Sequence, residues 1–292
     1  MRRFLAKTCL FLSIPGVISL ILFIFLQSSN SDLLYKYIAD RQFTSLVMGD
    51  SHTVLAIDDT LLNNCKNLSL EGENYVFTYA KLKAILGKKS SVRNIFLGVG
   101  FHNFSAYCDT RYDKRTDFPY SRDFSFVPFY DKMLMINKYR SVFATAFPYI
   151  IRSGFANLYG EEKNYSFLKK SYKGISGRSL DTAIILKRVQ VQFPGDSQFS
   201  DMQIYYLKKI VALCREHSVN ICFLTTPVHK SYFENIPFAY KEKYNSVVKS
   251  SNVPVIDFKE LNLPDSCFWA DGDHVNGSGA VLTTKLLSKH LD

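Results

Sequence analysis

Short apolar segments alternate with longer helix-like segments along this chain, and that alternation limits the folds it can adopt. Strand patterns occur at 45–48, 67–70, 94–99, 220–225 and 253–258, and helix patterns at 53–62, 75–86, 201–217, 232–250 and 277–290. Strands separated by helices form right-handed βαβ units, which build a parallel sheet covered on both faces. The sequence therefore predicts a three-layer α/β domain of about five parallel strands, with its functional site at the carboxyl ends of the strands.

The region from 104 to 200 interrupts this alternation. It is rich in Tyr, Phe, Lys and Arg, and its hydrophobic periodicity is weak. A structureless loop of that length is uncommon in a compact domain. We therefore predict an insertion that forms a cap or a docking surface and contains a few helices, one of them at 130–149.

An apolar run at 9–26 follows three basic residues within the first seven positions. A helix of roughly 20 apolar residues crosses the hydrocarbon core of a membrane, and basic residues before it favour a cytoplasmic N-terminus. We expect 1–31 to be a cytoplasmic stub and a single membrane anchor, and 32–292 to be an extracytoplasmic domain. A cleavable signal peptide is the alternative, although it usually has a shorter apolar core and a small-residue cleavage site.

Charge and cysteine content exclude some classes of function. The chain has 36 Lys and Arg against 26 Asp and Glu, but no basic cluster with interleaved aromatics, so nucleic-acid binding is not expected. Six cysteines are present, and no Cys/His spacing indicates zinc. A Cys65–Cys108 disulfide is conceivable, but we expect most thiols to be free and buried. No metal or organic cofactor is implied.

The first candidate for chemistry is the tetrapeptide Gly49-Asp50-Ser51-His52, directly after the first strand pattern. A serine at this junction is presented at the carboxyl end of the strand, and Gly49 allows the backbone to turn tightly. A nucleophilic serine needs this exposure and a nearby base. Serine is also a common helix N-cap, so this motif alone does not decide between the two roles.

The second candidate is Asp271-Gly272-Asp273-His274, which precedes the last helix pattern. A carboxylate three residues before a histidine can orient the imidazole from the same loop. The histidine can then act as the general base for a serine, while the aspartate fixes its tautomer. The alternative is a polar loop in which Asp273 caps a neighbouring element.

Together the two motifs resemble the SGNH/GDSL hydrolase superfamily over roughly 44–103 and 200–292. The resemblance implies a flavodoxin-like sheet of strand order 2-1-3-4-5 and a catalytic triad of Ser51, His274 and Asp271. It also implies an oxyanion hole formed by the Ser51 backbone N–H, Gly72 and Asn103.

The chain departs from the family pattern beside Asn103 and Ser51. The usual Gly-x-Asn-Asp block is replaced by Gly100-Phe101-His102-Asn103, and His52 stands where a leucine is usual. His102 or the Gly100 amide could replace Asn103 as a donor. His52, His102 and His229, which follows the fourth strand pattern, are candidates for substrate contact. For His229 the sequence favours the alternative, a structural residue held by loop carbonyls.

The apolar N-terminal run and the Asp-x-x-His-x-Asn ending also resemble envelope acyl-modifying members of this superfamily. We therefore predict a serine esterase or O-acyltransferase that acts on acyl esters, such as O-acetyl groups, of an extracytoplasmic glycan or envelope polymer. A membrane-bound acyltransferase is a candidate partner. The alternatives are a non-catalytic scaffold or glycan-binding protein on the same fold, and a lipase held at the membrane.

Overall fold

The computed structural model describes residues 34–114, 127–139, 179–195 and 197–291, with isolated positions before residue 19. Five strands form one sheet: β1 Ser45–Met48, β2 Cys65–Asn67, β3 Asn94–Gly98, β4 Asn220–Thr225 and β5 Val255–Asp257. The strand order is β2-β1-β3-β4-β5, and every neighbouring pair is parallel. The predicted α/β class, five parallel strands and strand order are thus confirmed.

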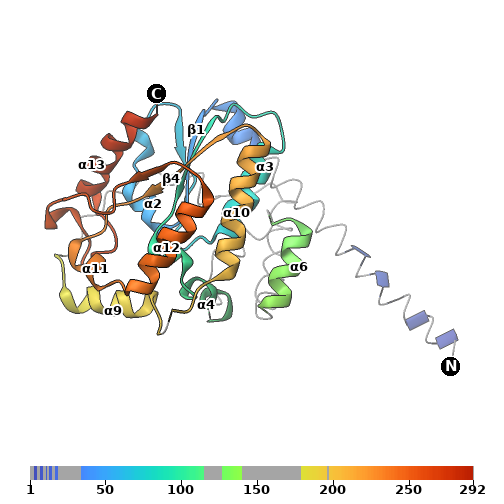
Figure 1. Cartoon of the computed structure of the whole chain (residues 1–292). Coiled ribbons are helices and arrows are strands. Elements are labelled where there is room, and N and C mark those ends of the chain that lie inside the picture. Colours follow the sequence, from blue (N-terminus) through green and yellow to red (C-terminus); the bar gives the residue numbers. More distant parts are fainter. Residues whose placement is uncertain are drawn as a thin grey trace.

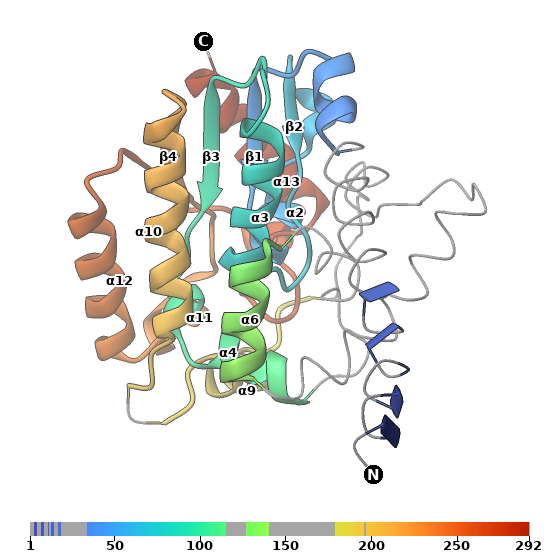
Figure 2. The same cartoon turned by 90° about the vertical axis from the view of Figure 1, so that its right-hand side faces the viewer.

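Helices cover both faces of the sheet (Figures 1 and 2). The α-helices described are α2 Ser51–Ala56, α3 Tyr75–Leu86, α4 Tyr107–Lys114, α6 Phe129–Lys138, α9 Thr182–Gln192, α10 Asp201–Glu216, α11 Lys230–Asn235, α12 Phe238–Ser251 and α13 Gly277–Leu287. The short 3₁₀ helices are η1 Asp59–Leu61, η2 Phe101–Phe104, η3 Asp265–Cys267 and η4 Ser288–His290. Helices α3, α10 and α12 pack on one face, and α2 and α13 on the other.

The two-residue period of the strands explains this layering. In β3, Ile95 and Leu97 belong to the larger apolar cluster under α3, α10 and α12, whereas Phe96 belongs to the cluster under α2 and α13. Successive side chains of a strand point to opposite faces, so a strand apolar throughout must be covered on both sides. The continuous apolar strand patterns of the sequence therefore already require three layers.

Two predicted elements are shifted in the structure. The second strand is Cys65–Asn67 and not 67–70, although Leu68 and Leu70 still donate backbone hydrogen bonds to the β1 segment. The first helix is not 53–62 but begins at Ser51 and ends at Ala56. Asp58 accepts a hydrogen bond from the Thr60 N–H and so starts η1 instead of continuing the helix.

The described parts of the insertion 104–200 are η2, α4, α6 and α9 with their flanking residues. The predicted helix at 130–149 corresponds to α6, which ends at Lys138, and 140–149 lie outside the described residues. Helix α9 is capped by Asp181, whose carboxylate accepts hydrogen bonds from two backbone N–H groups of the first turn. It packs against α11, as Figure 1 shows.

Within the described residues, no helix combines the length and apolar character needed to cross a bilayer. The predicted anchor at 9–26 is described only at isolated positions, so that prediction lies largely outside the described residues. The thiols of Cys65, Cys108, Cys214, Cys222 and Cys267 are free. Cys65 and Cys108 therefore do not form a disulfide, and free thiols are confirmed for these five positions.

Two glycines let α2 approach the sheet closely. Gly49 has φ +152°, and a Cβ placed there would lie 2.7 Å from Thr53 Oγ1. A Cβ at Gly98, on the neighbouring strand β3, would lie 2.5 Å from Thr53 Cγ2. Thr53 is fully buried and anchored by hydrogen bonds to the Asp50 carbonyl and the Ser69 hydroxyl. This contact fixes where α2, and with it Ser51, leaves the sheet.

We predict that Gly98→Ala lowers the free energy of unfolding by about 1–3 kcal/mol, because the new methyl group overlaps Thr53. Adding Thr53→Ser should restore part of that loss, since it removes the overlapping Cγ2 and keeps the hydroxyl. Urea unfolding of wild type, both single variants and the double variant measures the coupling. Simple additivity of the two substitutions would contradict this packing argument.

Candidate active site

Ser51 lies at the carboxyl edge of the sheet, at the first position of α2. The turn Gly49-Asp50 separates it from β1, and the Asp50 side chain caps the helix by accepting from the His52 N–H at 3.0 Å. Because Asp50 takes the capping role, the Ser51 side chain is not needed as a cap. The first backbone N–H groups of a helix have no partner within it, so the Ser51 N–H is available as a donor.

The structure brings together the three residues that the sequence selected. Ser51 Oγ lies 2.9 Å from His274 Nε2, and His274 Nδ1 lies 2.8 Å from Asp271 Oδ2. With the proton on Nδ1, His274 donates to Asp271 and accepts from Ser51. This is the geometry of a serine, a base and an orienting carboxylate, and its catalytic use is taken up as a proposal below.

Hydrogen bonds within the loop that carries His274 stabilise its conformation. The second oxygen of Asp271 accepts backbone hydrogen bonds from Asp273 at 3.1 Å and from His274 at 3.2 Å. Gly272, which stands between Asp271 and Asp273, has φ +62°, a conformation that glycine adopts without strain. The two-residue spacer between Asp271 and His274 thus lets one carboxylate bind both the backbone and the imidazole.

A buried polar cluster behind Ser51 was not anticipated from the sequence. Asp50 Oδ2 lies 2.6 Å from His102 Nε2 and accepts from Asn103 Nδ2 at 2.9 Å. Asn103 Oδ1 in turn accepts from the Gly100 N–H at 2.7 Å. These side chains are nearly fully buried, and they join the turn after β1 to the turn after β3. The sequence indicates Asp50 only as part of the serine motif, but in the structure its carboxylate hydrogen-bonds to residues of both turns.

His52 forms the second half of this cluster. Its ring stacks on that of His102, with centroids 4.2 Å apart. Its Nε2 lies 3.1 Å from Asp273 Oδ1, within ion-pair distance although the atoms are not aligned for a hydrogen bond. Asp273 is completely buried and also accepts from Arg188 Nε and Gln192 Nε2, each at 2.8 Å. Asp273 therefore caps no neighbouring helix but lies in a charged network.

The signal that could have found this cluster is positional. His52 and His102 each follow a strand, and those strands, β1 and β3, are neighbours in the predicted order. The ends of adjacent parallel strands meet at the same edge of a sheet, which brings the two imidazoles together. As candidates for substrate contact, both lie buried beneath the surface, with 8% and 3% of their areas exposed.

The remaining candidates lie near the site in different ways. Gly72 has φ +71° in the turn after β2, two residues beyond Leu70, whose N–H donates to the Gly49 carbonyl. The amide of Asn103 is already bonded to Asp50. Whether Gly72 and Asn103 serve an oxyanion stays a prediction. His229 caps α11 and pairs with Asp265 at 3.2 Å, so the structure gives it a structural role and no contact with Ser51 is described.

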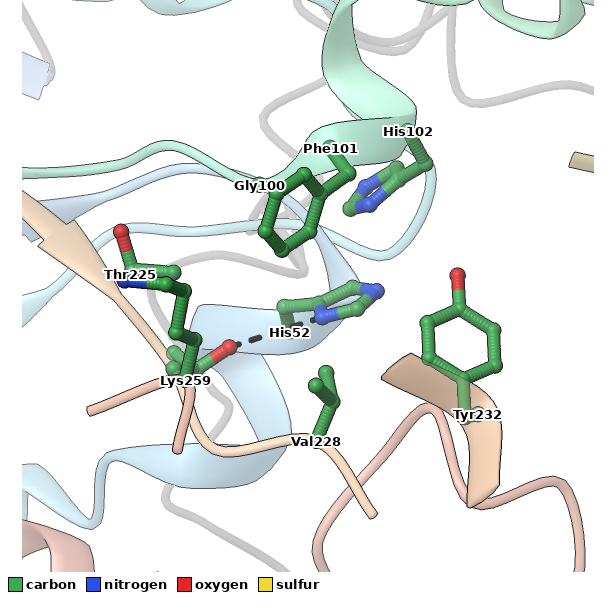
Figure 3. Close-up of a pocket in the computed structure, with 9 residues that line it drawn as sticks. His52, Gly100, Phe101, His102, Thr225, Val228, Tyr232 and Lys259 are labelled. Atoms are coloured by element: carbon green, nitrogen blue, oxygen red, sulfur yellow. Dashed lines mark hydrogen bonds between the residues drawn. The ribbon is translucent and has the colours of Figure 1, made fainter. Parts of the chain in front are cut away.

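A small pocket opens between the ends of β3 and β4. Its lining residues are His52, Gly100, Phe101, His102, Thr225, Thr226, Val228, Tyr232 and Lys259. Figure 3 shows the His52 ring among these side chains, with Tyr232 to one side of it. The Nδ1 atom of His52 lies 3.5 Å from the Thr226 hydroxyl oxygen. Ser51 is not among the lining residues described, so the pocket lies behind the nucleophile and we assign it no substrate.

The donor atoms of His52, His102 and Asp273 lie within 4.8 Å of one another, close enough to raise the question of a metal ion. The two imidazoles are stacked with an interplanar angle of 18°. Nitrogen lone pairs lie in the ring plane, so stacked rings do not aim them at one point. His102 Nε2 is moreover bonded to Asp50. This arrangement fits a hydrogen-bonded network better than a metal site.

Burial and charge act against each other in the cluster. Burial opposes ionisation of Asp50 and Asp273, but the histidines beside them, and Arg188 beside Asp273, outweigh it, so the pKa of each carboxyl is well below its ordinary value. Burial also opposes protonation of His52, yet Asp273 and Asp50 raise its pKa. Burial and the charge of His52 together lower the pKa of His102. One histidine is therefore favoured as the cation and the other as the neutral donor to Asp50.

Neither a protein-family model nor a curated protein matches this chain. Among solved structures, it is similar to one described as "The structure of a putative platelet activating factor from Streptococcus pneumonia". The two share 13% sequence identity with a TM-score of 0.44, over 97% of this chain and 99% of that one. A likeness this distant carries no argument about function, which rests on the site itself.

We predict that acid destabilises this fold below about pH 4. Burial opposes ionisation of Asp271 too, but the hydrogen bond from His274 outweighs it and lowers its pKa. Carboxyls with lowered pKa values, here Asp50, Asp271 and Asp273, contribute stability that is present above their unfolded values and lost as the pH falls through their folded values. The raised pKa of His52 acts oppositely, because its contribution is lost as the pH rises through the folded value.

Urea unfolding between pH 3 and pH 9 tests this expectation. Asp271→Asn should weaken the acid dependence, whereas Glu216→Gln, which removes an exposed carboxylate on α10, should leave it unchanged. A free energy of unfolding that stays constant from pH 6 to pH 3 would show that the pKa values of these carboxyls are the same in the folded and the unfolded protein.

Proposed function

We propose that this chain is a serine-dependent esterase or O-acyltransferase with Ser51 as its nucleophile. The observation that carries the proposal is the hydrogen-bonded series from Ser51 Oγ through His274 to Asp271. It stands at the carboxyl edge of a parallel sheet, where α/β proteins place their sites. Two segments at opposite ends of the domain supply it, 223 residues apart, so local chain geometry alone does not account for it.

The reaction would proceed in two balanced steps. His274 takes the proton of Ser51 as Oγ attacks the ester carbonyl, and the tetrahedral intermediate collapses when His274 returns that proton to the leaving alcohol. The acyl group is then an ester of Ser51. Water or an acceptor hydroxyl attacks the acyl carbon in the second step and loses its proton to His274, which returns it to Ser51 Oγ as the bond between Oγ and the acyl carbon breaks. Asp271 stabilises the imidazolium in both steps.

Stabilisation of the oxyanion is proposed to come first from the Ser51 backbone N–H, with Gly72 and Asn103 as further donors. One hydrogen of the Asn103 amide is committed to Asp50. The loss of one such donor typically costs about 10²–10³ in turnover. A site with a reduced set of donors would therefore still be active, but slower.

The substrate class extends from the sequence resemblance. We propose acyl esters such as O-acetyl groups on an extracytoplasmic glycan or envelope polymer, with the location resting on the N-terminal run alone. Hydrolysis and transfer share the same acyl-enzyme, so they differ only in what attacks it. Exclusion of water by the insertion 104–200 would favour transfer, with a membrane-bound acyltransferase as the candidate partner.

A second candidate is a non-catalytic binding protein or scaffold on the same fold. The observation that favours it is the commitment of the Asn103 side chain, which donates one amide hydrogen to Asp50 and accepts from the Gly100 N–H, so that only one side-chain hydrogen of Asn103 remains for an oxyanion. In that case the ordered Ser51–His274 pair would serve recognition and not acyl transfer.

We expect a fluorophosphonate probe to label the full-length chain at Ser51, because an activated serine attacks phosphorus as it attacks an acyl carbon. Ser51→Ala should abolish labelling and lower the hydrolysis of p-nitrophenyl acetate by roughly 10⁴-fold, with a similar loss for His274→Ala. Asp271→Asn should retain more activity.

Ser278→Ala is the matched control, since Ser278 also lies in the first turn of a helix but is exposed, and its hydroxyl has no hydrogen bond to a histidine among the described residues. It should react like wild type. Undiminished labelling of Ser51→Ala would exclude Ser51 as the nucleophile. A folded wild-type chain that resists labelling would instead favour the binding protein.

A further inference from the structure

One face of α9 is fitted to the loop that carries the base. At the start of the helix, the Asp181 N–H donates to the Ala270 carbonyl at 3.1 Å. One turn later Ile185 lies over Gly272, where a Cβ would come within 3.2 Å of its side chain. Arg188 and Gln192, in the next turns, both bind the Asp273 carboxylate. These spacings of three and four residues place all the contacts on one side of the helix.

The far end of this face is fixed as well. Gln192 also accepts a hydrogen bond from the hydroxyl of Tyr232, on α11. The Gln192 and Tyr232 side chains are fully buried. Helix α9 belongs to the insertion 104–200, which the sequence assigned to a cap or docking surface. Its C-terminal helix is instead built into the frame of the site.

Asp273 stands at the electrostatic centre of this contact. Its carboxylate is completely buried, touches Arg188 and His52, and lies 3.9 Å from His274 Nδ1. A buried charge that loses its partner is strongly destabilising, so the Arg188–Asp273 pair holds the loop firmly against α9. At this distance the negative charge of the Asp273 carboxylate acts on the His274 ring, and the positive charge of Arg188 beside it has the opposite sign.

We propose that Asp273 and Arg188 are positioning residues, which hold the His274 loop in register with Ser51 and balance the charge that His274 experiences. The proposal rests on the esterase function above. It assigns the insertion a part in the reaction, because without α9 the His274 loop would lose its contacts with this helix and Asp273 would lose the positive charge of Arg188.

His274 faces Asp271 and Asp273 of its own loop and the ring of His52 from the serine turn. Further charged and titratable groups act on Asp273 or His52 from the elements packed around them: Asp50 from the serine turn, His102 from η2, Arg188 from α9 and Tyr232 from α11. Arg188 is the one whose removal changes the charge beside Asp273 without touching Ser51, His274 or Asp271. It is therefore the residue to vary.

The two members of the pair should shift the pH dependence in opposite directions. Arg188→Gln removes the positive charge that offsets the negative charge of Asp273, which favours the imidazolium form of His274. The acidic limb of the pH–rate profile should therefore move to higher pH, by roughly half a unit or more. Asp273→Asn removes the negative charge and moves the limb to lower pH. The double variant should lie near wild type, and Arg188→Lys, which retains the charge, should keep the wild-type limb. A purely structural role would not give shifts of opposite sign.

The experiment measures the rate of fluorophosphonate labelling against pH and, separately, the titration of the His274 imidazole by NMR in ¹³C-histidine-labelled full-length protein. Lys187→Gln is the matched control, because it removes one positive charge from the adjacent, exposed position of α9. Lys187→Gln should change neither the pH dependence of labelling nor the NMR titration curve of His274. Should Asp273→Asn fail to fold, the contrast between Arg188→Gln and Lys187→Gln still decides the matter.

The NMR titration separates the two proposals. Absence of labelling together with the expected NMR shift in Arg188→Gln would refute the esterase function and leave the charge balance standing. Normal labelling with identical curves for Arg188→Gln, Lys187→Gln and wild type would overturn the positioning role alone.

Discussion

The site depends first on the carboxylate of Asp50. One oxygen accepts from the His52 N–H and starts α2, and the other binds His102 and Asn103 from the turn after β3. Hydrogen bonds to an ionised acceptor are about twice as strong as neutral ones, and here they replace the water that a buried carboxylate would otherwise need. Two separate turns are thereby locked together. The position of Ser51 follows from that lock and from the close packing of Thr53 on Gly98.

Much of this fold could be predicted from local patterns. The strands 45–48 and 220–225 and the helix 75–86 have the predicted bounds, because continuous apolar runs and clear stop signals mark them. The parallel sheet followed from the alternation of elements, and its strand order was implied by the resemblance to the SGNH/GDSL superfamily. The second strand was misplaced because it is only three residues long and lies at the edge of the sheet, where few contacts define its ends.

The site was predictable where the interacting residues lie close together in one loop, as Asp271 and His274 do, and where a serine directly follows a strand. The network behind it was not. Asp50, Asp273 and Arg188 each pair with a residue from another element, and such pairs depend on the packing of helices whose positions the sequence pattern does not specify. Arg188 in particular lies in a region of weak periodicity, so nothing marked it as a partner of the loop.

The distribution of the site along the chain has a consequence for its assembly during synthesis. Ser51 is synthesised first, helix α9 much later, and the loop with His274 almost last, since Ser51 and His274 are 223 residues apart. The hydrogen bond between Ser51 and His274 therefore cannot form before the base loop has been synthesised, so the proposed nucleophile lacks its base until the domain is nearly complete.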